Sequence, residues 1–346
     1  MTRIAVWNTA FLGDAVLTLP LLQSLRLSRP GARIDFYVRK GLECLFTAHP
    51  GIDAVFPVDK KDNSVAGFLR LKRELVSRSY DIWISAHASL RSGLVAATSR
   101  APLRIGYASP LYNRMCYSHI VDRRFNELEE VERLLQLLQP LDNIRLSTWP
   151  ELALCEDDLH KADVFFKTIG GPVLGLHPGS VWPTKRWPAA YFADIGRRAI
   201  EAGAQAFLFA GPGEEAIAKE VCDAIRSGLS PEKRKNLHDL SGRLSLPRLA
   251  AYLGSLSCYL TNDSGPMHIA WALRTPVTAI FGPTVKKLGF FPRGSRSTVF
   301  EIDIACRPCG LHGPKKCPKG HHHCMTQLLP DTVWPDVQGK LFAQKE

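Results

Sequence analysis

Short apolar runs, each followed by a turn and then a helical pattern, recur along this chain and constrain its fold more than any other feature. In the first half, strands are predicted at residues 3–7, 33–38, 54–58 and 81–85. Helical patterns lie between them, at residues 15–27 after a turn at Gly13-Asp14, and at residues 65–78. This order predicts a parallel sheet with helices on both faces.

The same alternation starts again after a segment typical of a domain boundary. Residues 144–171 contain Pro150, a charged stretch at 156–158 and a Gly170-Gly171-Pro172 breaker. Beyond it, strands are predicted at residues 173–177, 206–210, 258–261 and 277–281, and helices at 191–202, 214–227, 246–255 and 266–272. We therefore expect two doubly wound α/β domains, at residues 1–160 and 171–330, and a C-terminal helix at 331–346. The deepest cleft should lie between the two domains, beyond the carboxyl ends of their strands.

The charge of the chain points to an anionic partner. The sequence has 44 Lys and Arg residues against 33 Asp and Glu residues, a formal charge of +11. No long Lys/Arg run and no nucleic-acid-binding motif accompanies this surplus, so nucleic acid is not the expected partner. The apolar run at the N-terminus is interrupted by Asn8, Gly13 and Asp14, which makes it a poor membrane span and a poor signal peptide. We expect a cytoplasmic protein that binds a phosphorylated small molecule or an anionic membrane face.

One strand-to-helix junction in the second half suits the binding of an anion. A predicted strand ends at Thr261, and a helix begins near Pro266, a residue that suits the first helical position. Gly265 lets a ligand approach the backbone, Ser264 adds a hydroxyl, and the free N–H groups of the helix end attract negative charge. The alternative is a plain helix cap by Asp263 or Ser264, which the spacing alone leaves open.

Two further junctions carry groups that suit a nucleotide. His177-Pro178-Gly179-Ser180 is followed by Lys185-Arg186-Trp187-Pro188, whose two cations would neutralise a diphosphate; the alternative is a surface loop with solvated cations. Residues 209–215 resemble a glycine-rich nucleotide turn with a carboxylate for a ribose hydroxyl. They do not form a full Gly-x-Gly-x-x-Gly fingerprint, so this signal is weak by itself.

The first half offers one candidate for proton transfer. Asp14 follows Leu12-Gly13 at the first strand-to-helix turn, where a carboxylate can accept a proton from a substrate hydroxyl. The alternative is an aspartate that caps the following helix, which is the commoner role of an isolated Asp at such a turn.

Taken together, these segments closely resemble glycosyltransferase family 9, the lipopolysaccharide heptosyltransferases. The similar segments follow one another along nearly the whole chain. They are residues 8–25, with Gly13-Asp14-Ala15-Val16 and Leu19-Pro20; 177–180 with 185–188; and 262–268 with Phe281-Gly282-Pro283-Thr284.

The resemblance implies a GT-B fold, in which two Rossmann-like domains face each other across a cleft. The N-terminal domain would bind the acceptor and the C-terminal domain the nucleotide sugar. The C-terminal helix, at 331–346, would pack back on the N-terminal domain, as the last helix of GT-B folds often does. The implied donor is ADP-L-glycero-D-manno-heptose, and the implied acceptor is the lipid A–Kdo inner core, with or without a first heptose. The enzyme would work with inversion and without a required cofactor. Its basic surface would hold it at the anionic inner face of the inner membrane.

The resemblance also assigns roles to particular residues. Asp14 matches the general base, and Lys185 matches the residue that contacts the donor phosphates. Gly13, beside the base, is a candidate acceptor contact. So are Arg91 and Ser92 after the fourth predicted strand, with an ordinary helix start as the alternative for these two. The remaining donor-binding residues implied in this way are Ser180, Glu214, Glu215, Leu244, Asp263, Ser264, Gly265, Pro266 and His268. Glu214 and Glu215 are alternatives for the ribose, Leu244 would contact the adenine, and Asp263 and His268 would lie beside the sugar.

A cysteine-rich segment near the C-terminus is a separate candidate site. Cys306, Cys309, Cys317 and Cys324 lie close together in sequence, and three histidines precede the last of them. Thiolates and imidazoles at such spacing suit a structural zinc ion, and stable disulfides are less expected in a cytoplasmic protein. The resemblance implies no general metal requirement, so the metal ligands stay undetermined.

Three other functions compete with this interpretation. A family 9 transferase with another acceptor or nucleotide sugar, used in surface polysaccharide assembly, would show the same motifs. A non-catalytic sugar-nucleotide binding module would not need Asp14. An NAD-dependent dehydrogenase would need a glycine fingerprint after the first strand, but the segment from Asn8 to Asp14 contains a single glycine.

Overall fold

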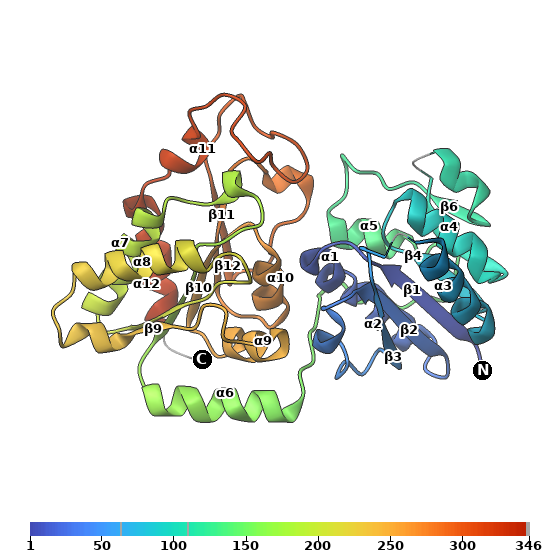
Figure 1. The fold of residues 1–346 in the computed structure, drawn as a ribbon, viewed down its shortest axis with the longest axis horizontal. Helices are drawn as coiled ribbons and strands as arrows, with labels where there is room; N and C mark the ends of the chain where they lie inside the picture. The colour runs from blue at the N-terminus through green and yellow to red at the C-terminus, as the bar shows by residue number, and fades with distance from the viewer. Residues whose placement is uncertain (63, 109–110, 344–346) are drawn as a thin grey trace. The chain divides into compact units, whose positions relative to one another are not determined.

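The computed structural model describes residues 1–62, 64–108 and 111–343 (Figure 1). The chain divides into two compact units, Met1–Leu154 and Cys155–Glu346. Each unit is described here by itself. Within the described residues, no helix is both long enough and apolar enough to cross a membrane.

The N-terminal unit is built on a six-stranded sheet in which every pair of neighbouring strands is parallel, in the order β3-β2-β1-β4-β5-β6. The central strands are buried on both faces, which explains why their sequences are continuous apolar runs. The strands are β1 (Arg3–Asn8), β2 (Arg33–Arg39), β3 (Ala54–Val58), β4 (Ile82–Ser85), β5 (Leu103–Tyr107) and β6 (His119–Val121).

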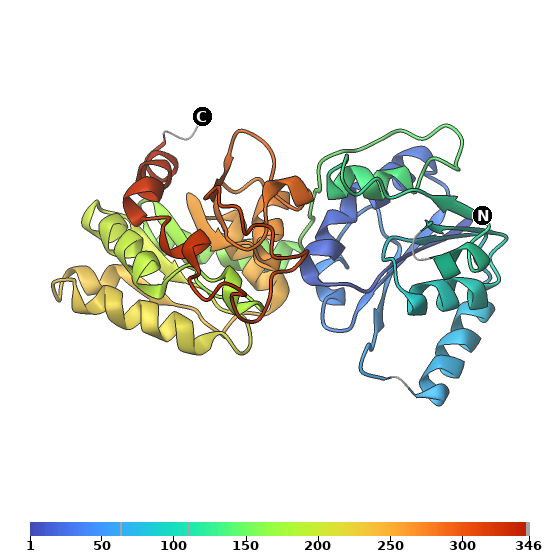
Figure 2. The ribbon, with the colours of Figure 1, turned by 90° about the horizontal axis from the view of Figure 1, so that it is seen from above.

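Helices cover both faces of this sheet. Packing contacts join α1, α2 and α5 into one layer, whereas α3 and α4 contact each other (Figures 1 and 2). The helices are α1 (Leu12–Leu17), α2 (Leu19–Ser28), α3 (Val65–Arg78), α4 (Leu90–Ser99) and α5 (Glu130–Gln136), with single turns η1 (Glu43–Leu45) and η2 (Leu111–Met115).

The first predicted helix, at residues 15–27, is wrong in its boundaries. Gly13 and Asp14 do not form a turn; they lie in the first helical turn of α1. The helix then ends at Thr18 and a second one begins at Leu19. Pro20 explains the break, because proline has no N–H to donate to the carbonyl four residues earlier and suits the first turn of a new helix.

The C-terminal unit repeats this architecture with a second six-stranded parallel sheet, in the order β12-β11-β10-β7-β8-β9. The prediction of two doubly wound α/β sheets is confirmed. The strands are β7 (Val173–His177), β8 (Gln205–Leu208), β9 (Leu237–Asp239), β10 (Cys258–Asn262), β11 (Val277–Phe281) and β12 (Ser297–Glu301). The sheet order reverses direction at β7, between β10 and β8, and such switch points are where ligands bind in open α/β sheets.

Two helical layers flank this sheet. Contacts join α7, α8 and α12 in one layer and α6, α9 and α10 in the other (Figures 1 and 2). The helices are α6 (Glu156–Ile169), α7 (Ala189–Glu201), α8 (Glu215–Ser227), α9 (Leu246–Gly254), α10 (Gly265–Ala272), α11 (His323–Thr326) and α12 (Pro330–Leu341), with single turns η3 (Pro183–Lys185), η4 (Lys233–Asn236) and η5 (Lys286–Leu288).

The C-terminal helix belongs to the core of its own unit. Val333, Val337 and Leu341 of α12 are buried in the same apolar cluster as residues of β7, β8 and β10. Lys340 and Asp336 add polar anchors, since Lys340 Nζ lies 2.8 Å from the carbonyl oxygen of Val277 and 2.7 Å from Asp336 Oδ2. The apolar face of this helix is thus covered within its own unit, and its packing against the N-terminal domain stays a prediction. The end of the predicted segment, residues 344–346, lies outside the described residues.

Candidate functional site

A lysine, an aspartate and a threonine meet at the carboxyl edge of the C-terminal sheet. Lys185 Nζ lies 2.6 Å from Asp263 Oδ2, and Thr284 Oγ1 donates to the same oxygen at 2.6 Å. Asp263 follows β10, Thr284 follows β11, and Lys185 ends the turn η3 after β7. All three residues are less than a tenth exposed. The structure thus joins two predicted residues, Lys185 and Asp263, and adds Thr284, whose role the sequence did not indicate.

Asn262 explains how the loop after β7 is held against β10. Its Nδ2 donates to the carbonyl oxygen of Pro178 at 2.9 Å, and its Oδ1 accepts the N–H of Trp187 at 3.0 Å. Trp187 is fully buried. Residues 178 and 187 flank Lys185, so these contacts fix both ends of the loop that carries the lysine.

Helix α10 begins directly after Asp263 and presents its N-terminus at the same edge. Ser264 occupies the N-cap position, but no side chain caps the helix. Its hydroxyl lies 3.2 Å from Thr261 Oγ1 instead. Gly265 and Pro266 form the first turn, so the N–H of Gly265 and those that follow Pro266 are the groups available to an anion. The alternative of a plain side-chain cap does not describe this junction.

His268, one turn further along α10, is buried and electrically neutral near pH 7. Burial lowers its pKa to about 4; the charge of Asp263 opposes this shift and that of Lys185 adds to it. Its Nδ1 is buried and has no hydrogen-bond partner among the described residues. A buried polar atom of this kind is costly to leave unsatisfied, so His268 offers a ready contact to a bound polar group.

Glu214 is held in place by a chain of hydrogen bonds. His177 Nε2 lies 3.0 Å from Glu214 Oε2, and His177 Nδ1 lies 2.7 Å from the hydroxyl of Tyr259. The N–H of Gly211 donates to the same Oε2 at 3.0 Å. No hydrogen bond is made by Oε1 in the described structure, so one oxygen of the carboxylate can accept from a ligand. Burial raises the pKa of Glu214, but the contacts with His177, the N–H of Gly211 and the charge of Arg186 together lower it below its ordinary value.

Gly179 explains why this arrangement needs a glycine. A Cβ atom at residue 179 would lie 2.3 Å from Glu214 Oε2. Any larger residue would push the carboxylate away from His177, so the glycine of the sequence motif makes room for Glu214.

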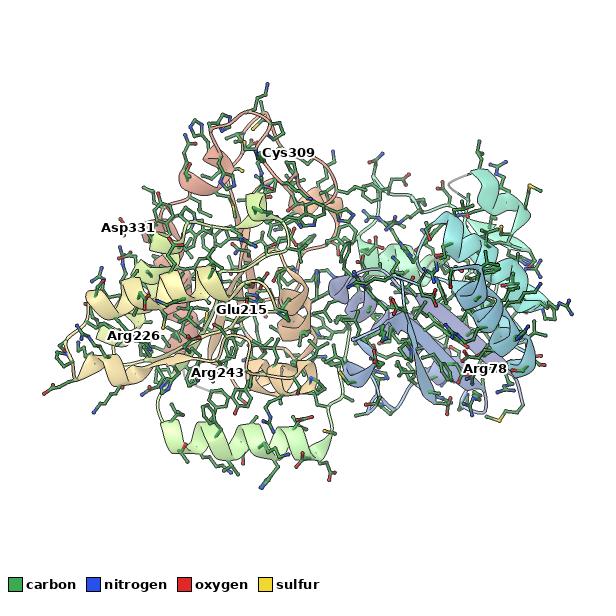
Figure 3. The ribbon with its side chains drawn as sticks, in the orientation of Figure 1. Arg78, Glu215, Arg226, Arg243, Cys309 and Asp331 are labelled. Atoms are coloured by element: carbon green, nitrogen blue, oxygen red, sulfur yellow. The ribbon has the colours of Figure 1, made fainter. Side chains whose placement is uncertain are left out.

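Glu215 lies in a different environment from Glu214. Glu215 is exposed and its Oε2 accepts the N–H of Gly213 at 2.8 Å, at the start of α8 (Figure 3). Of the two carboxylates that the sequence could not separate, Glu214 is the one oriented by other side chains. Ser180 and Leu244 are the remaining predicted donor-binding residues. Ser180 is buried, and its carbonyl oxygen accepts from Arg186 Nε at 2.9 Å. Leu244 is half-buried and precedes α9.

The surroundings of Asp14 raise the pKa of its carboxyl group. The N–H of Phe11 donates to Asp14 Oδ2 at 3.0 Å, whereas Oδ1 makes no hydrogen bond in the described structure. Burial and the charge of Glu130 raise the pKa of Asp14 to about 6, against the opposing charge of Arg123. Asp14 thus contributes to the cap of α1, as the alternative interpretation expected, and also keeps one basic oxygen available.

The three predicted acceptor contacts have different surroundings. Ser92 is buried, and its hydroxyl accepts from the indole N–H of Trp7 at 3.1 Å; this fits the alternative of a structural helix start. Gly13 is buried in α1. Arg91 is half-buried and donates to the carbonyl oxygen of Asp59 at 3.2 Å.

Further charged groups around Asp14 had no signal in the sequence. Burial and the charge of Arg91 lower the pKa of the Lys60 amine, whereas the charge of Asp14 raises it. His87 follows β4; burial lowers its pKa to about 4, with Lys60 and Arg123 adding to the shift. Lys60 follows β3, His87 follows β4 and Arg123 follows β6. Because they lie on three different loops, the spacing of residues in the sequence could not reveal them.

The cysteine-rich segment between β12 and α11 contacts the loops that follow β7 and β11. Arg307 Nη2 donates to the carbonyl oxygen of Thr284 at 2.6 Å, and the N–H of Cys309 donates to that of Pro283 at 2.8 Å (Figure 3). His322 Nε2 lies 2.7 Å from the carbonyl oxygen of Thr184. Thr184 precedes Lys185, and Thr284 belongs to the Lys185 cluster. Contacts with the cysteine-rich segment therefore help to hold that cluster in place.

The expected zinc ion finds no support in this segment. All nine cysteines of the chain are free thiols. Across residues 1–62, 64–108 and 111–343, no group of three or more His, Cys, Asp or Glu side chains is placed to hold a metal ion. The contacts described above account for the position of the segment without a metal.

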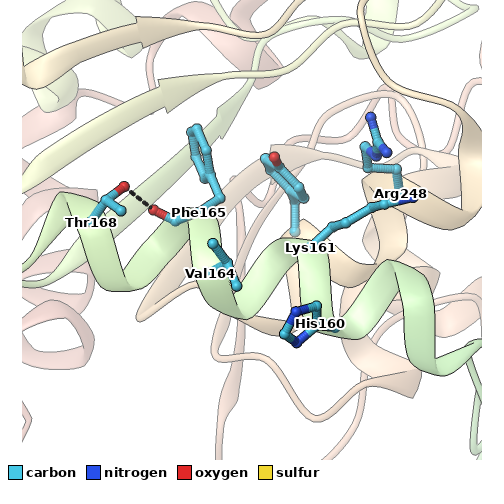
Figure 4. Close-up of a pocket in the computed structure, with 7 residues that line it drawn as sticks. His160, Lys161, Val164, Phe165, Thr168 and Arg248 are labelled. Atoms are coloured by element: carbon cyan, nitrogen blue, oxygen red, sulfur yellow. Dashed lines mark hydrogen bonds between the residues drawn. The ribbon is translucent and has the colours of Figure 1, made fainter.

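An open pocket lies elsewhere in the C-terminal unit, between α6 and α9 (Figure 4). Phe165 and Tyr252 stack there with ring centroids 5.0 Å apart, and Lys161 and Arg248 lie at the rim. The pocket is on a helical layer, away from the carboxyl ends of the strands, and it contains none of the predicted site residues.

The chain is similar in sequence to known glycosyltransferases. Residues 68–317 match the family model described as glycosyltransferase family 9 (heptosyltransferase). The chain is 30% identical to lipooligosaccharide heptosyltransferase 2 of Campylobacter jejuni serotype O:2, over 96% of this chain and 96% of that protein. It is 30% identical to lipopolysaccharide heptosyltransferase 1 of Pseudomonas aeruginosa, over 89% of this chain and 86% of that protein.

A solved structure has the same fold. Escherichia coli heptosyltransferase WaaC with ADP-2-deoxy-2-fluoro heptose matches with a TM-score of 0.73 and 20% identity, covering 97% of this chain and 99% of that chain. The predicted GT-B fold class is confirmed by this match.

Proposed function

This chain belongs to glycosyltransferase family 9, and from that premise we propose that it transfers heptose from ADP-L-glycero-D-manno-heptose to the inner core of lipopolysaccharide. The chain is an enzyme of the glycosyltransferase class. The acceptor in this proposal is Kdo-lipid A, or the same glycolipid already carrying one heptose. Relatives named heptosyltransferase 1 and heptosyltransferase 2 are equally similar to the chain, at 30% identity, so both acceptors stay in the proposal.

The observation that carries the donor assignment is the Lys185–Asp263–Thr284 cluster beside the uncapped N-terminus of α10. A buried ammonium group and a helix N-terminus together favour a diphosphate. In the absence of donor, Asp263 balances the charge of Lys185. A bound diphosphate would give the same lysine a second anionic partner. We propose that Ser264, Gly265 and Pro266 line the diphosphate site, with Asp263 and His268 beside the sugar.

The nucleoside part of the proposal uses the loops that flank this cluster. Glu214 Oε1 would accept a ribose hydroxyl, because Oε2 is already engaged by His177 and Gly211. Leu244 would contact the adenine, and Ser180 would lie near the phosphates. The C-terminal unit is thus the proposed donor-binding domain.

The chemistry follows from these groups. Asp14 takes the proton of the acceptor hydroxyl, whose oxygen attacks the anomeric carbon from the face opposite ADP, so the configuration inverts. Negative charge grows on the leaving diphosphate, where Lys185 and the α10 N–H groups stabilise it. Protein cations do this work, so the proposal requires no cofactor.

The N-terminal unit is the proposed acceptor-binding domain, with Arg91 and Gly13 near the acceptor hydroxyl. Lys60, Arg91 and Arg123 supply positive charge around Asp14, which suits an acceptor that carries carboxylates and phosphates. The overall charge of +11 further suits transient contact of a cytoplasmic enzyme with the anionic inner face of the inner membrane. Binding to vesicles that contain an anionic lipid should weaken as salt increases; salt-independent binding would contradict membrane contact.

The direct test of the donor is isothermal calorimetry with ADP, UDP, GDP and NAD. We expect ADP to bind at least about tenfold more tightly than the other three, a difference of about 1.4 kcal/mol. A preference for UDP or GDP would keep the fold and remove ADP-heptose as the donor. Binding of NAD alone would overturn the proposed function.

Glu214 and Glu215 form a matched pair for testing the ribose contact. Glu214→Ala should weaken ADP binding about 10- to 100-fold, because a hydrogen bond to a charged group contributes about 1.5–3 kcal/mol. Glu215→Ala should leave the affinity nearly unchanged, since its carboxylate is exposed and bonds its own helix start. Calorimetry with ADP measures both. Equal effects of the two substitutions would contradict the assignment of the ribose to Glu214.

A further inference from the structure

Arg123, Glu130 and Arg133 form a cluster of three charged side chains in the N-terminal unit. Arg123 Nη2 donates to both oxygens of Glu130, at 2.7 and 2.9 Å. Arg133 Nη1 donates to Glu130 Oε2 at 2.9 Å. The side chain of Glu130 is 4% exposed and that of Arg133 is 0% exposed. Glu130 is thus a buried carboxylate held by two guanidinium groups.

Local structure fixes this cluster firmly. Glu130 is the first residue of α5, and Arg133 lies one turn further along the same helix. Arg133 Nη2 also donates to the carbonyl oxygen of Phe125 at 2.7 Å, and its guanidinium carbon lies 4.2 Å from the centre of the Phe125 ring. The hydroxyl of Tyr107 donates to the carbonyl oxygen of Arg133 at 3.0 Å. Glu130 therefore has little freedom to turn away from Arg123.

Asp14 is within the electrostatic reach of this cluster, because α1 packs against α5. Glu130 and Arg123 act on the Asp14 carboxyl in opposite directions. Lys60, from the loop after β3, is the other cation that interacts electrostatically with Asp14. Arg39, at the end of β2, lies over the ring of Phe11 at 5.7 Å, next to the start of α1. Among the described residues, Glu130, Arg123 and Lys60 interact electrostatically with Asp14, whereas Arg39 and Arg91 act on Lys60.

The ion pair of Arg123 with Glu130 affects the proton affinity of Asp14. An arginine next to a free carboxylate favours the ionised form and makes that carboxylate a poor proton acceptor. Here both hydrogen bonds of Arg123 Nη2 go to Glu130, and among the described residues the Asp14 carboxylate accepts the N–H of Phe11. Glu130 thus holds a negative charge beside Arg123, and its effect on the Asp14 carboxyl is the larger of the two.

We infer that Glu130 is a positioning residue for proton transfer: it retains Arg123 in an ion pair and so keeps the Asp14 carboxylate basic enough to deprotonate an acceptor hydroxyl. This inference rests on the proposed role of Asp14 as general base. Its effect agrees in direction with the raised pKa of Asp14. A base is most effective when its pKa lies near the working pH, which is the benefit that Glu130 provides.

Two substitutions should move the acidic limb of the kcat–pH profile in opposite directions. Glu130→Gln removes the negative charge and frees Arg123 to stabilise ionised Asp14, so the limb should move to lower pH by at least about half a unit, roughly a threefold change in proton affinity. Arg123→Gln removes the positive charge, so the limb should move to higher pH. Glu127→Gln is the control, because Glu127 pairs with Arg124 at the surface and is 60% exposed.

A carbon-13 NMR titration of the Asp14 carboxyl in substrate-free protein separates this inference from the proposed function. A lower pKa in Glu130→Gln and a higher one in Arg123→Gln would support the inference. An unchanged pKa in both folded variants would overturn it. If the pKa moves but the kcat–pH profile does not follow, the electrostatic coupling stands and the assignment of Asp14 as base fails. Arg123→Gln keeps the Glu130–Arg133 pair, so it remains a usable test if Glu130→Gln does not fold.

Discussion

Replacing Asp14 by alanine should lower turnover by about 10²–10⁴-fold, the usual contribution of a general base, while leaving the affinity for ADP unchanged. ADP lacks the hydroxyl that Asp14 would deprotonate, and the proposed ADP contacts all belong to the C-terminal unit. Turnover is measured as transfer from ADP-heptose to a Kdo-lipid A acceptor, and affinity by calorimetry. Asp142→Ala is a suitable control, since Asp142 is an exposed aspartate of the same unit.

Asp14→Asn sharpens this test. The amide oxygen can still accept the N–H of Phe11, but it cannot take a proton, so turnover should fall as far as in the alanine variant. An equal loss of turnover and of ADP affinity in both variants would contradict the role of base. If Asp14→Asn keeps most of the activity, proton removal by Asp14 is not part of the reaction.

The pH dependence of both activity and stability follows from the same carboxyl. Its folded pKa, about 6, lies above the ordinary value of 3.8, so the folded protein binds the proton more tightly than the unfolded chain. Turnover should therefore fall as the pH drops through about 6. As the pH falls from 6 to 4, this carboxyl should increase the free energy of unfolding, because the folded protein binds the proton more tightly. Asp14→Asn should remove that increase. Thermal melting at pH 8 and pH 5 measures it.

The central strands of both sheets could be predicted because their surroundings are uniform. Residues 173–177 and 277–281 were predicted with the bounds that the structure shows, and residues 3–7 and 33–38 end one residue before β1 and β2 do. A strand buried on both faces is a continuous apolar run, which stands out in a sequence. The strands β5, β6, β9 and β12 were not predicted, because they are short or carry polar residues such as Arg104 and His119.

The candidate site could be predicted only in part, for a related reason. Gly265 and Pro266 mark a strand-to-helix junction, and such local geometry is visible in sequence. The ion pair of Lys185 with Asp263 joins residues 78 positions apart, and only the register of β7 beside β10 brings them together. Motif spacing could not reveal Thr284 as a partner of Asp263, nor Glu130 and Arg123 as neighbours of Asp14. Tertiary contacts of this kind exist only once the sheet order is known.

Replacing Lys185 by methionine should weaken ADP binding about 10- to 100-fold and lower turnover by a further factor. Removal of one preorganised donor to a developing negative charge typically costs about 3 kcal/mol, and the lysine ammonium is buried beside the proposed diphosphate site. Calorimetry with ADP measures the first effect and transfer kinetics the second. Lys287→Met is the control, because Lys287 is an exposed lysine of the same unit.

The same substitution should also destabilise the protein, and this effect must be separated from binding. Without Lys185 the Asp263 carboxylate is left buried, with Thr284 as its remaining side-chain donor, and breaking a buried pair costs about 3–5 kcal/mol. The double variant Lys185→Met/Asp263→Asn removes the unpaired charge, so it should recover most of the lost unfolding free energy. Its ADP affinity should stay low, because the cation is still missing. If ADP affinity recovers together with stability, Lys185 acts on the fold and not on the diphosphate, and the donor assignment fails.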